Sequence, residues 1–360
     1  MKIGDAPELG RYITQTTEKI KPEGLAKTRQ VYPGDLVLSN SMSFGRPYIM
    51  AIRGCIHDGW LLIRDAQKHF DPIFLCHMLG APQMLNQYRM FAAGSTVNNL
   101  NKELVGKAIV SLPSKDEQRE IGIVLDRLDS LITLHQRKYD KLCVLKKSML
   151  DKMFPKGGSL YPEIRFAGFT DPWEQRKLGE LASKRIEKNT NGIKETFTNS
   201  AEHGVVSQLD YFDHDITNDA NIGNYSVVHP DDFIYNPRIS AVAPCGPINR
   251  NKLDRNGVMS PLYTVFSVDD TIDKLYLEHY FKTSRWHQFM FLEGNSGARS
   301  DRFSISDSIF FEMPIQCPVL EEQELIASFF GRLDSLITLH QRKLELLRNI
   351  KKSMLDKMFV

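Results

Sequence analysis

The stretch Arg127-Leu-Asp-Ser-Leu-Ile-Thr-Leu-His-Gln-Arg-Lys138 returns without a single change as residues 332–343. A second block, Lys146-Lys-Ser-Met-Leu-Asp-Lys-Met-Phe154, returns as residues 351–359. Both copies are displaced by 205 residues, so 21 positions are identical in one constant register. Chance does not preserve such a register, and the chain is therefore a tandem duplication.

The repeated blocks follow the heptad spacing of a coiled coil, with seam residues at alternating steps of four and three. The first seam contains Ile121, Leu125, Leu128, Ile132, His135, Tyr139, Leu142, Lys146, Met149 and Met153. The second contains Ile326, Phe330, Leu333, Ile337, His340, Leu344, Leu347, Lys351, Met354 and Met358. We expect Val124, Leu131 and Leu145 to widen the buried stripe of the first helix.

The seams predict two long helices, one over about residues 115–154 and the other over about 321–359. Each would be roughly 60 Å long. A polar helix of this length is not stable alone, so we expect the two helices to pack against each other. A pseudo-two-fold relation between the repeats favours antiparallel pairing; parallel pairing is the alternative.

A mixed α/β globule precedes each helix. In the first, a Pro-Gly-Asp turn at 33–35 leads into a strand, further strands are expected at 48–53, 59–64 and 108–112, and Asp71 caps a helix over 72–85,. The second repeats these landmarks, with a helix expected at 275–281. The predicted fold is α+β: a first globule at 1–113, a helix at 114–154, a linker at 155–172, a second globule at 173–318 and a helix at 319–360.

Composition restricts the class of protein. The chain has 42% hydrophobic and 25% charged residues, and a net charge of only +2, so any basic surface must be local,. Five scattered cysteines without a C-x-x-C pair indicate reduced thiols,. No apolar run approaches about 20 residues and no signal peptide is evident, so we expect a cytoplasmic protein without membrane contact.

Motifs of catalysis are not found in the sequence. There is no phosphate-binding loop, dinucleotide fingerprint or nucleophile elbow,. Asn236-Pro-Arg-Ile239 has a weak similarity to the Asn-Pro-Pro-Tyr motif of amino-methyltransferases, but a strand-end turn is the more ordinary interpretation. His135 and His340 could bind a metal between the helices, although polar seam residues more often set the register.

The loops of both globules are the candidate nucleic-acid contacts. Asn can pair with adenine and Arg with guanine in the major groove, and each side chain can instead serve an ordinary turn or surface. The first globule offers Asn40, Ser41, Ser43, Arg46, Asn98, Asn99 and Asn101. The second offers Asn236, Arg238, Asn249, Arg250, Asn295, Arg299 and Arg302. The many lysines and arginines of the helices are either a solvated face or contacts to phosphates or partners.

Two variable globules, each followed by a near-identical helix that opens with Pro…Glu-Gln and carries Leu-Asp-Ser-Leu-Ile-Thr-Leu-His-Gln-Arg-Lys, resemble the specificity subunit of type I restriction-modification enzymes. Trp173-Glu-Gln-Arg-Lys-Leu-Gly-Glu-Leu181 resembles the usual opening of a target recognition domain of that family. The resemblance covers nearly the whole chain.

The resemblance implies a subunit without chemistry of its own. Each globule would read one half of a split site in double-stranded DNA, and the helices would set the gap and dock two modification subunits. The cofactors, S-adenosylmethionine, ATP and magnesium, are expected in the modification and restriction subunits and not in this chain. A structural coiled-coil scaffold without DNA specificity is the alternative function.

The first globule departs from the family pattern at its start. Counted from Trp173, 57 residues of the second globule precede Pro230, whereas only 32 precede Pro33. The first globule also has no counterpart of the Trp-Glu-Gln-Arg-Lys opening. We therefore expect it to lack at least one strand, which would leave an exposed sheet edge.

Overall fold

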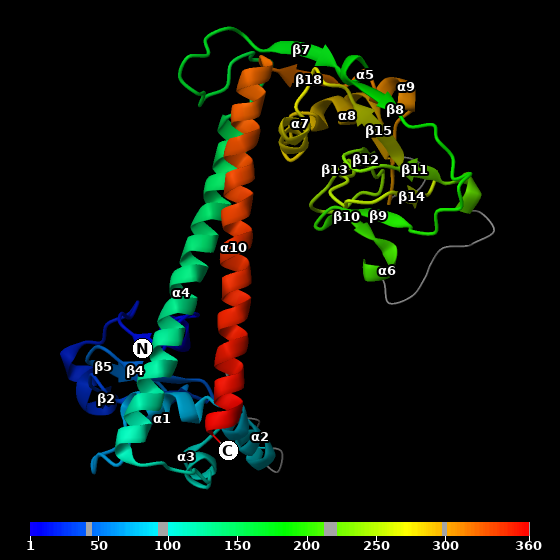
Figure 1. Ribbon diagram of the computed structural model, residues 1–360. Coiled ribbons are helices and arrows are strands. Elements are labelled where there is room, and N and C mark those ends of the chain that lie inside the picture. Colours follow the sequence, from blue (N-terminus) through cyan, green and yellow to red (C-terminus); the bar gives the residue numbers. More distant parts are fainter. Residues whose placement is uncertain (41–44, 93–99, 212–221, 297–300, 360) are drawn as a thin grey trace. The chain divides into compact units, whose positions relative to one another are not determined.

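The computed structural model describes residues 1–40, 45–92, 100–211, 222–296 and 301–359. The chain forms two compact units, Met1–Lys141 with Ile337–Val360, and Leu142–Leu336. Each unit contains one globule and a part of both long helices, α4 (Lys115–Lys152) and α10 (Leu320–Met358) (Figure 1). Both helices begin and end within two residues of the prediction.

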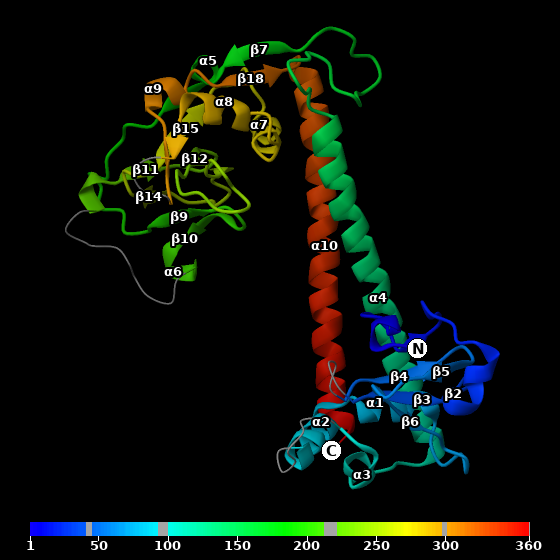
Figure 2. The same cartoon turned by 180° about the vertical axis from the view of Figure 1, so that it is seen from behind.

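The two long helices run antiparallel, as predicted (Figures 1 and 2). In the first unit, Gln136 of α4 accepts a hydrogen bond of 2.9 Å from Arg348 of α10, and Asp129 forms an ion pair with Lys351. In the second unit, Lys146 forms an ion pair with Asp334. Later residues of α4 thus meet earlier residues of α10, which excludes parallel pairing.

The predicted seam forms the interface in both units. Every described seam residue except Met358, in the last turn, is buried or half-buried. The prediction of a wider stripe is wrong, because Val124, Leu131 and Leu145 are 38%, 43% and 39% exposed. A pair of helices covers only a narrow seam, so flanking apolar residues face solvent.

The first globule contains a four-stranded sheet in the order β1-β4-β3-β6, in which β1 is parallel to β4 and the other pairs are antiparallel. Helices α1 and α2 follow β6. The elements are η1 (Ile3–Asp5), β1 (Tyr12–Ile13), η2 (Pro22–Lys27), β2 (Arg29–Val31), β3 (Leu36–Ser39), β4 (Pro47–Met50), β5 (Gly54–Ile56), β6 (Trp60–Ile63), α1 (Pro72–Leu79), α2 (Pro82–Ala92) and α3 (Lys102–Gly106).

Helix α1 begins and ends for identifiable reasons. The Asp71 side chain accepts hydrogen bonds from the amides of Ile73 and Phe74, which confirms the predicted N-cap,. The single helix predicted over 72–85 is wrong, because α1 ends at Gly80 and α2 restarts at Pro82. Proline has no amide to continue the helix and disfavours helical backbone in the residue before it.

The strand predicted at 108–112 is also absent. These residues are described but form no strand, and Ile109 and Leu112 are 79% and 47% exposed. Their counterpart in the second globule, β18 (Pro314–Cys317), pairs with β7 (Glu174–Lys177). Because the first globule has no equivalent of β7 among its described residues, segment 108–112 has nothing to pair with.

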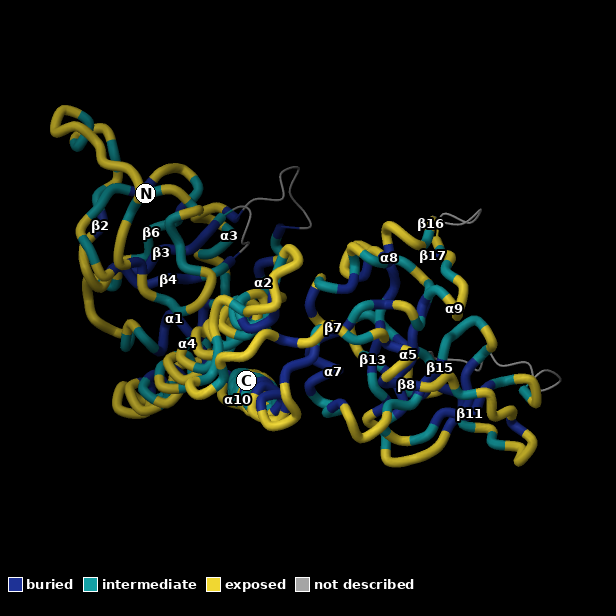
Figure 3. The backbone as a smooth tube through the Cα atoms, turned by 90° about the horizontal axis from the view of Figure 1, so that it is seen from above, coloured by how far each residue is buried: buried dark blue, intermediate teal, exposed yellow. Residues whose placement is uncertain are grey.

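The second globule repeats the central strands in the sheet β13-β12-β15-β8. Helix α7 confirms the prediction at 275–281 and is buried along most of its length, as α1 is (dark blue in Figure 3). In addition to β7 and β18, the elements of the second globule are α5 (Leu178–Leu181), β8 (Ala182–Lys184), β9 (Phe197–Ser200), β10 (Gly204–Ser207), α6 (Gln208–Tyr211), η3 (Ile222–Asn224), β11 (Ser226–Val228), β12 (Phe233–Tyr235), β13 (Ile248–Arg250), β14 (Gly257–Met259), β15 (Thr264–Val268), α7 (Lys274–Tyr280), α8 (His287–Glu293), β16 (Asn295–Ser296), β17 (Phe303–Ser304) and α9 (Asp307–Phe310).

The repeated Pro…Glu-Gln motif ties each long helix to its own globule. Buried Gln118 accepts a 3.0 Å hydrogen bond from the amide of Asp71 and donates to the carbonyl of Pro113. Gln323 does the same with Asp273 and Pro318, at 2.9 Å each. The glutamine side chain thereby fixes the N-terminus of α1 or α7 against the first turn of α4 or α10.

The linker at 155–172 packs on the second unit. Arg165 donates two hydrogen bonds of 2.8 Å to the fully buried carboxylate of Glu322. The amide of Ile164 donates to the carbonyl of Lys152, and the ring of Phe166 lies edge-on to that of Phe329. The segment is thus an ordered part of this unit. No helix within the described ranges is long and apolar enough to cross a membrane.

Candidate nucleic-acid interface

The described ends of the two predicted loops of the first globule lie side by side. The loop that follows β3 is closed by hydrogen bonds between Ser39 and Arg46, and the amide of Leu100, at the end of the second loop, donates to the carbonyl of Asn40 at 3.2 Å. Four of the candidates, Ser41, Ser43, Asn98 and Asn99, lie outside the described residues. The described ends of the two loops, at Asn40 and Leu100, are in contact.

The second globule repeats this arrangement. The amide of Phe303 donates to the carbonyl of Pro237 at 2.8 Å, and the backbones of Arg238 and Arg302 form an antiparallel bridge. Arg299 lies outside the described residues. The duplicated globules therefore join the same two loops, the one after the central strand and the one before β17 or α3.

Three side chains of this second loop pair are available to a ligand. Arg238 and Asn295 are exposed. The Arg302 side chain is about one-third exposed, and its Nε lies 3.9 Å from the carboxylate of Asp301. The exposed part of a guanidinium can bind a base edge or a phosphate.

Other candidates of the second globule are occupied inside it. The Asn236 side chain donates to the carbonyl of Asn199, and the Asn249 side chain donates at 2.6 Å to the side chain of Asn199. Both are at most 8% exposed. Arg250 pairs with Asp231 and Glu278. These three side chains hold strands together.

Two candidates of the first globule also have structural roles. The Asn40 side chain donates to the carbonyl of Asp58 at 2.7 Å. The Asn101 side chain caps α3 by accepting from the amide of Leu104 at 2.9 Å. Both keep part of their surface in solvent, and contact with DNA stays a prediction for them.

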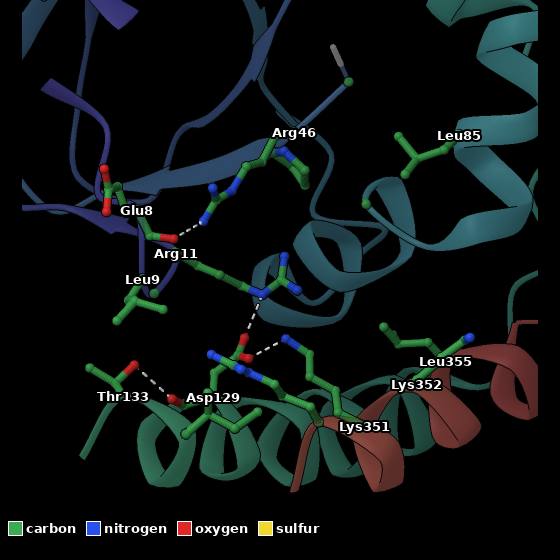
Figure 4. Close-up of a pocket in the computed structure, with 16 residues that line it drawn as sticks. Glu8, Leu9, Arg11, Arg46, Leu85, Asp129, Thr133, Lys351, Lys352 and Leu355 are labelled. Atoms are coloured by element: carbon green, nitrogen blue, oxygen red, sulfur yellow. Dashed lines mark hydrogen bonds and ion pairs between the residues drawn. The ribbon is translucent and has the colours of Figure 1, made fainter. Parts of the chain in front are cut away.

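Arg46 lies in a groove that is lined by the first globule and by residues of α4 and α10 (Figure 4). The groove has a volume of about 560 Å³. Arg46 donates to the carbonyl of Glu8 at 2.6 Å, and its guanidinium lies 5.1 Å from the centre of the Tyr48 ring. The charged side chains of the wall are mostly cationic, which suits a phosphate: Arg11, Arg46, Arg348, Lys351 and Lys352, with Asp129 and Glu8 opposite in sign,.

The floor of the groove is a partly buried charge cluster. Arg11 donates to Asp129 at 2.7 Å, and Lys351 pairs with the other carboxylate oxygen. Burial alone would raise the pKa of Asp129, but the charges of Arg11 and Lys351 outweigh it and hold this pKa below its ordinary value,. Asp129 is therefore a carboxylate that fastens the first globule to both helices.

The repeated aspartates have a role that was not predicted from the sequence. Asp129 and Asp334 are the same position of the two repeats, and so are their lysine partners, Lys351 and Lys146. Each ion pair joins α4 to α10. The signal that could have found them is their identity in both copies at positions next to the seam.

The two seam histidines meet as predicted for a register pair. The Nδ1 atoms of His135 and His340 are 2.8 Å apart, so one ring donates and the other accepts. Burial, the neighbouring His340 and nearby lysines lower the pKa of His135. Within the described ranges, no group of three or more possible metal ligands is present, so His135 and His340 have no third residue with which to bind a metal ion.

Comparison with known proteins gives a consistent result. The family model described as "Type I restriction modification DNA specificity domain" matches residues 4–143 and 170–349, which include both globules. The MjaX specificity subunit of a type I restriction enzyme from Methanocaldococcus jannaschii is 23% identical, with 94% of this chain and 80% of the relative covered. The MjaVIII specificity subunit of the same organism is 21% identical, over 91% and 78%.

A solved structure shares the fold. The type I restriction-modification S subunit from M. genitalium matches with a TM-score of 0.58 at 12% identity, covering all of this chain and 91% of that one. Since the family model matches most of the chain in two copies, the role in a complex is recognition of DNA sequence, with the catalytic steps in other subunits. The chain belongs to the family of type I restriction-modification DNA specificity subunits.

Proposed function

We propose that each globule reads one half of a bipartite site in double-stranded DNA through its pair of joined loops. The observation that carries this proposal is the repetition of one loop arrangement in both globules, from Leu100–Asn40 in the first to Phe303–Pro237 in the second. In the second globule we assign the reading to Arg238, Asn295 and Arg302. In the first, Arg46 in its basic groove contacts a phosphate,.

The pair α4–α10 sets the length of the gap between the half-sites. Support comes from the two helices, which contain no proline and only two glycines, Gly122 and Gly331. Two ion pairs and the histidine pair fix its register. A paired helix resists bending and sliding, as a spacer must.

The helices also dock two modification subunits, and restriction subunits join this complex. Support comes from apolar residues that the repeats expose alike: Leu131 and Leu336 are 43% and 44% exposed, and Leu134 and Leu339 are 47% and 45% exposed. Identical exposed leucines in identical sequence present the same surface twice, which fits two copies of one partner. S-adenosylmethionine, ATP and magnesium would be bound by these partners.

The decisive experiment maps methylated adenines in cells that hold the partner subunits. With the chain present, we expect methylation at one bipartite motif; with the chain deleted, none at that motif. An Arg238→Ala, Arg302→Ala variant should relax one half of the motif and leave the other unchanged. Arg255→Ala, which removes an exposed arginine paired with Glu195 at 3.0 Å, is the control.

Two outcomes would oppose the proposal. A methylation pattern that does not change on deletion would remove the recognition role and favour a scaffold protein. Equal loss of both halves in the double variant would contradict modular reading. Binding to random duplex should weaken as salt rises, because phosphate contacts release counterions; binding that is insensitive to salt would leave only the scaffold.

A further inference from the structure

We propose that the exposed faces of α2 and α8 read bases in the major groove of DNA, with Met90 and Leu292 in contact with thymine methyl groups. The inference rests on the proposed function, because it adds a second reading element to each globule. The residues that it names lie outside the loops described above.

Helices α2 and α8 occupy equivalent positions in the two globules. The sequence alignment that matches the caps of α1 and α7 also matches α2 with α8 residue by residue. It pairs Met84 with Trp286 and Tyr88 with Met290, and these four side chains are at most 3% exposed. One face of each helix is therefore fixed in the core of its own globule.

The start of each helix is also held at an equivalent place. In the first unit, the Gln83 side chain donates to the carbonyl of Asp356 of α10 at 3.2 Å. In the second unit, the Arg285 side chain donates to the carbonyl of Asp151 of α4 at 2.6 Å. Asp151 and Asp356 are the same position of the two repeats. The core contacts and this hydrogen bond together determine which face of α2 and α8 points outward.

The outward faces carry the same two kinds of side chain in the same order. An amide, Asn86 or Gln288, is exposed. One turn later, the apolar side chain of Met90 or Leu292 is 67% or 74% exposed. A single exposed apolar residue is ordinary on a protein surface. Its repetition, next to an amide, on two equivalent helices indicates a ligand that both helices share.

Each helix lies next to the loop pair of its globule. In the first globule, a Cβ added to Gly45 would lie 2.9 Å from Leu85, so the backbone at Gly45 packs against α2. In the second, the ring of Phe291, which is 53% exposed, lies 6.0 Å from the ring of Phe303. The amide of Phe303 donates to the carbonyl of Pro237. The outward faces thus continue the surface to which we assign DNA contact.

An amide followed by an apolar side chain matches the chemistry of A·T base pairs. Asn or Gln can pair with adenine, and an apolar side chain can contact the methyl group of thymine. One turn of helix advances about 5.4 Å, which spans one to two base pairs at about 3.4 Å each. Glu293, also exposed on α8, can accept a hydrogen bond from cytosine,.

One position of the outward face differs between the helices. Arg89 of α2 corresponds to Phe291 of α8, and both are exposed. Arg89 donates to the Asn86 side chain at 3.1 Å and can pair with guanine, whereas a phenylalanine offers only apolar contact,. The two helices therefore suit different half-sites.

The test measures binding of the chain, purified with its modification subunits, to duplexes that carry its methylated motif. Each thymine is replaced in turn by deoxyuridine, which removes only the methyl group. The half-site of the second globule is the one that the Arg238→Ala, Arg302→Ala variant relaxes. In this half-site, we expect one replacement to weaken binding about fourfold, the effect of one buried methyl group.

The variant Leu292→Ala assigns this effect to α8. It should weaken binding to the thymine duplex by at least about fivefold, and the thymine and deoxyuridine duplexes should then bind equally, as a double-mutant cycle requires. Met90→Ala should do the same in the other half-site. Ile186→Ala, at an 82% exposed apolar residue of the second globule, is the control and should keep the methyl effect.

Three results would overturn the inference. A Leu292→Ala complex that keeps its sensitivity to the same methyl group would remove α8 from base reading and leave the loops as readers. Loss of a modification subunit from that complex, counted by native mass spectrometry, would assign the face to a protein partner. A wild-type complex that binds no bipartite motif would end the proposed function itself, and this inference with it.

Discussion

At the scale of single residues, the most informative positions are the identical aspartates of the two repeats. Asp129 and Asp334 each bind a lysine of the opposite helix, and Asp129 also binds Arg11 of the first globule. Beneath each ion pair lies a buried histidine, His77 or His279, whose ring nitrogens have no hydrogen-bond partner among the described residues. At both places where a globule joins the helices, an ion pair therefore lies next to a buried histidine.

The first prediction concerns Arg11. Arg11→Met should lower the free energy of unfolding by about 1–3 kcal/mol, because it removes one of the two cations that compensate the partly buried Asp129. The side chains of Arg11 and Asp129 are only 14% and 15% exposed. Arg29→Met is the matched control, since its pair with Asp58 is 53% and 91% exposed and should contribute less than about 1 kcal/mol,. Urea unfolding of both variants measures the difference.

The second prediction concerns the pH dependence of stability. Burial, and then the charge of Lys146, lower the pKa of His279 to about 4, whereas an unfolded histidine has a pKa of about 6.5. Between these values the unfolded chain binds more protons than the folded chain, so stability falls as the pH drops from about 6.5 toward 4. This residue accounts for up to about 3 kcal/mol of the loss.

A comparison of variants isolates this histidine. His279→Gln should reduce the slope of unfolding free energy against pH in that window, measured by urea unfolding at several pH values. His57→Gln, at an exposed histidine, is the control for the substitution itself. An equal slope in the His279 variant would mean that other groups carry the acid sensitivity.

At the scale of elements, the two long helices combine a narrow buried seam with repeated exposed leucines. The seam buries only one stripe of each helix. Leu134 and Leu339 belong to the repeated stretch but lie outside that stripe, so both remain exposed to solvent. Heptad spacing alone predicts the seam residues. It does not predict the flanking residues correctly, because Val124, Leu131 and Leu145 were expected to be buried and are exposed. Which flank is covered depends on the packing partner and not on the period.

The third prediction tests the docking role of this surface. Leu134→Glu should reduce the number of modification subunits bound per chain from two to one, and adding Leu339→Glu should remove the second. The reason is that each variant places a charge at the centre of one exposed apolar surface. Native mass spectrometry counts the subunits. Gln341→Glu, an exposed polar position of α10, should still bind two.

The fourth prediction tests the spacer role. Insertion of seven residues that continue the seam after His135, and of seven after His340, preserves the heptad register and lengthens each helix by about 10 Å. The gap in the methylated motif should change while both half-sites keep their sequence. An unchanged gap in a folded, active complex would mean that the helices do not set the spacing.

At the scale of the whole molecule, the duplication provides two readers with separate cores. The buried clusters of the first globule and of the second contain no residue in common. Modules with independent cores can vary their loops without disturbing each other. In the proposed function, this separation lets each globule recognise its own half of the DNA site.

The fifth prediction follows from this independence. Replacement of residues 173–318 by the corresponding globule of another family member should change one half of the methylated motif to that of the donor and leave the other half as it is. The graft should keep Gln323 and Glu322, which hold the globule and the linker to α10. Adenine methylation mapping in cells reads both halves at once, and a change in both would contradict separate reading.

The sequence by itself determined the duplication, the two helices, their seam and the order of the landmarks in the globules. These features depend on local spacing and on identity between distant copies, which one chain displays directly. The tertiary structure decided which polar side chains are free. Asn249 and Arg302 look alike as candidates, yet Asn249 is buried against Asn199, whereas the Arg302 side chain is about one-third exposed.

Tertiary structure also decided which of the predicted strands form. Segment 108–112 has the composition of a strand and does not form one. A strand is stabilised by hydrogen bonds to a neighbour, so its existence depends on a partner that sequence patterns do not supply. The helices carry their hydrogen bonds within themselves, and for that reason the opening repeat could be interpreted from the sequence alone.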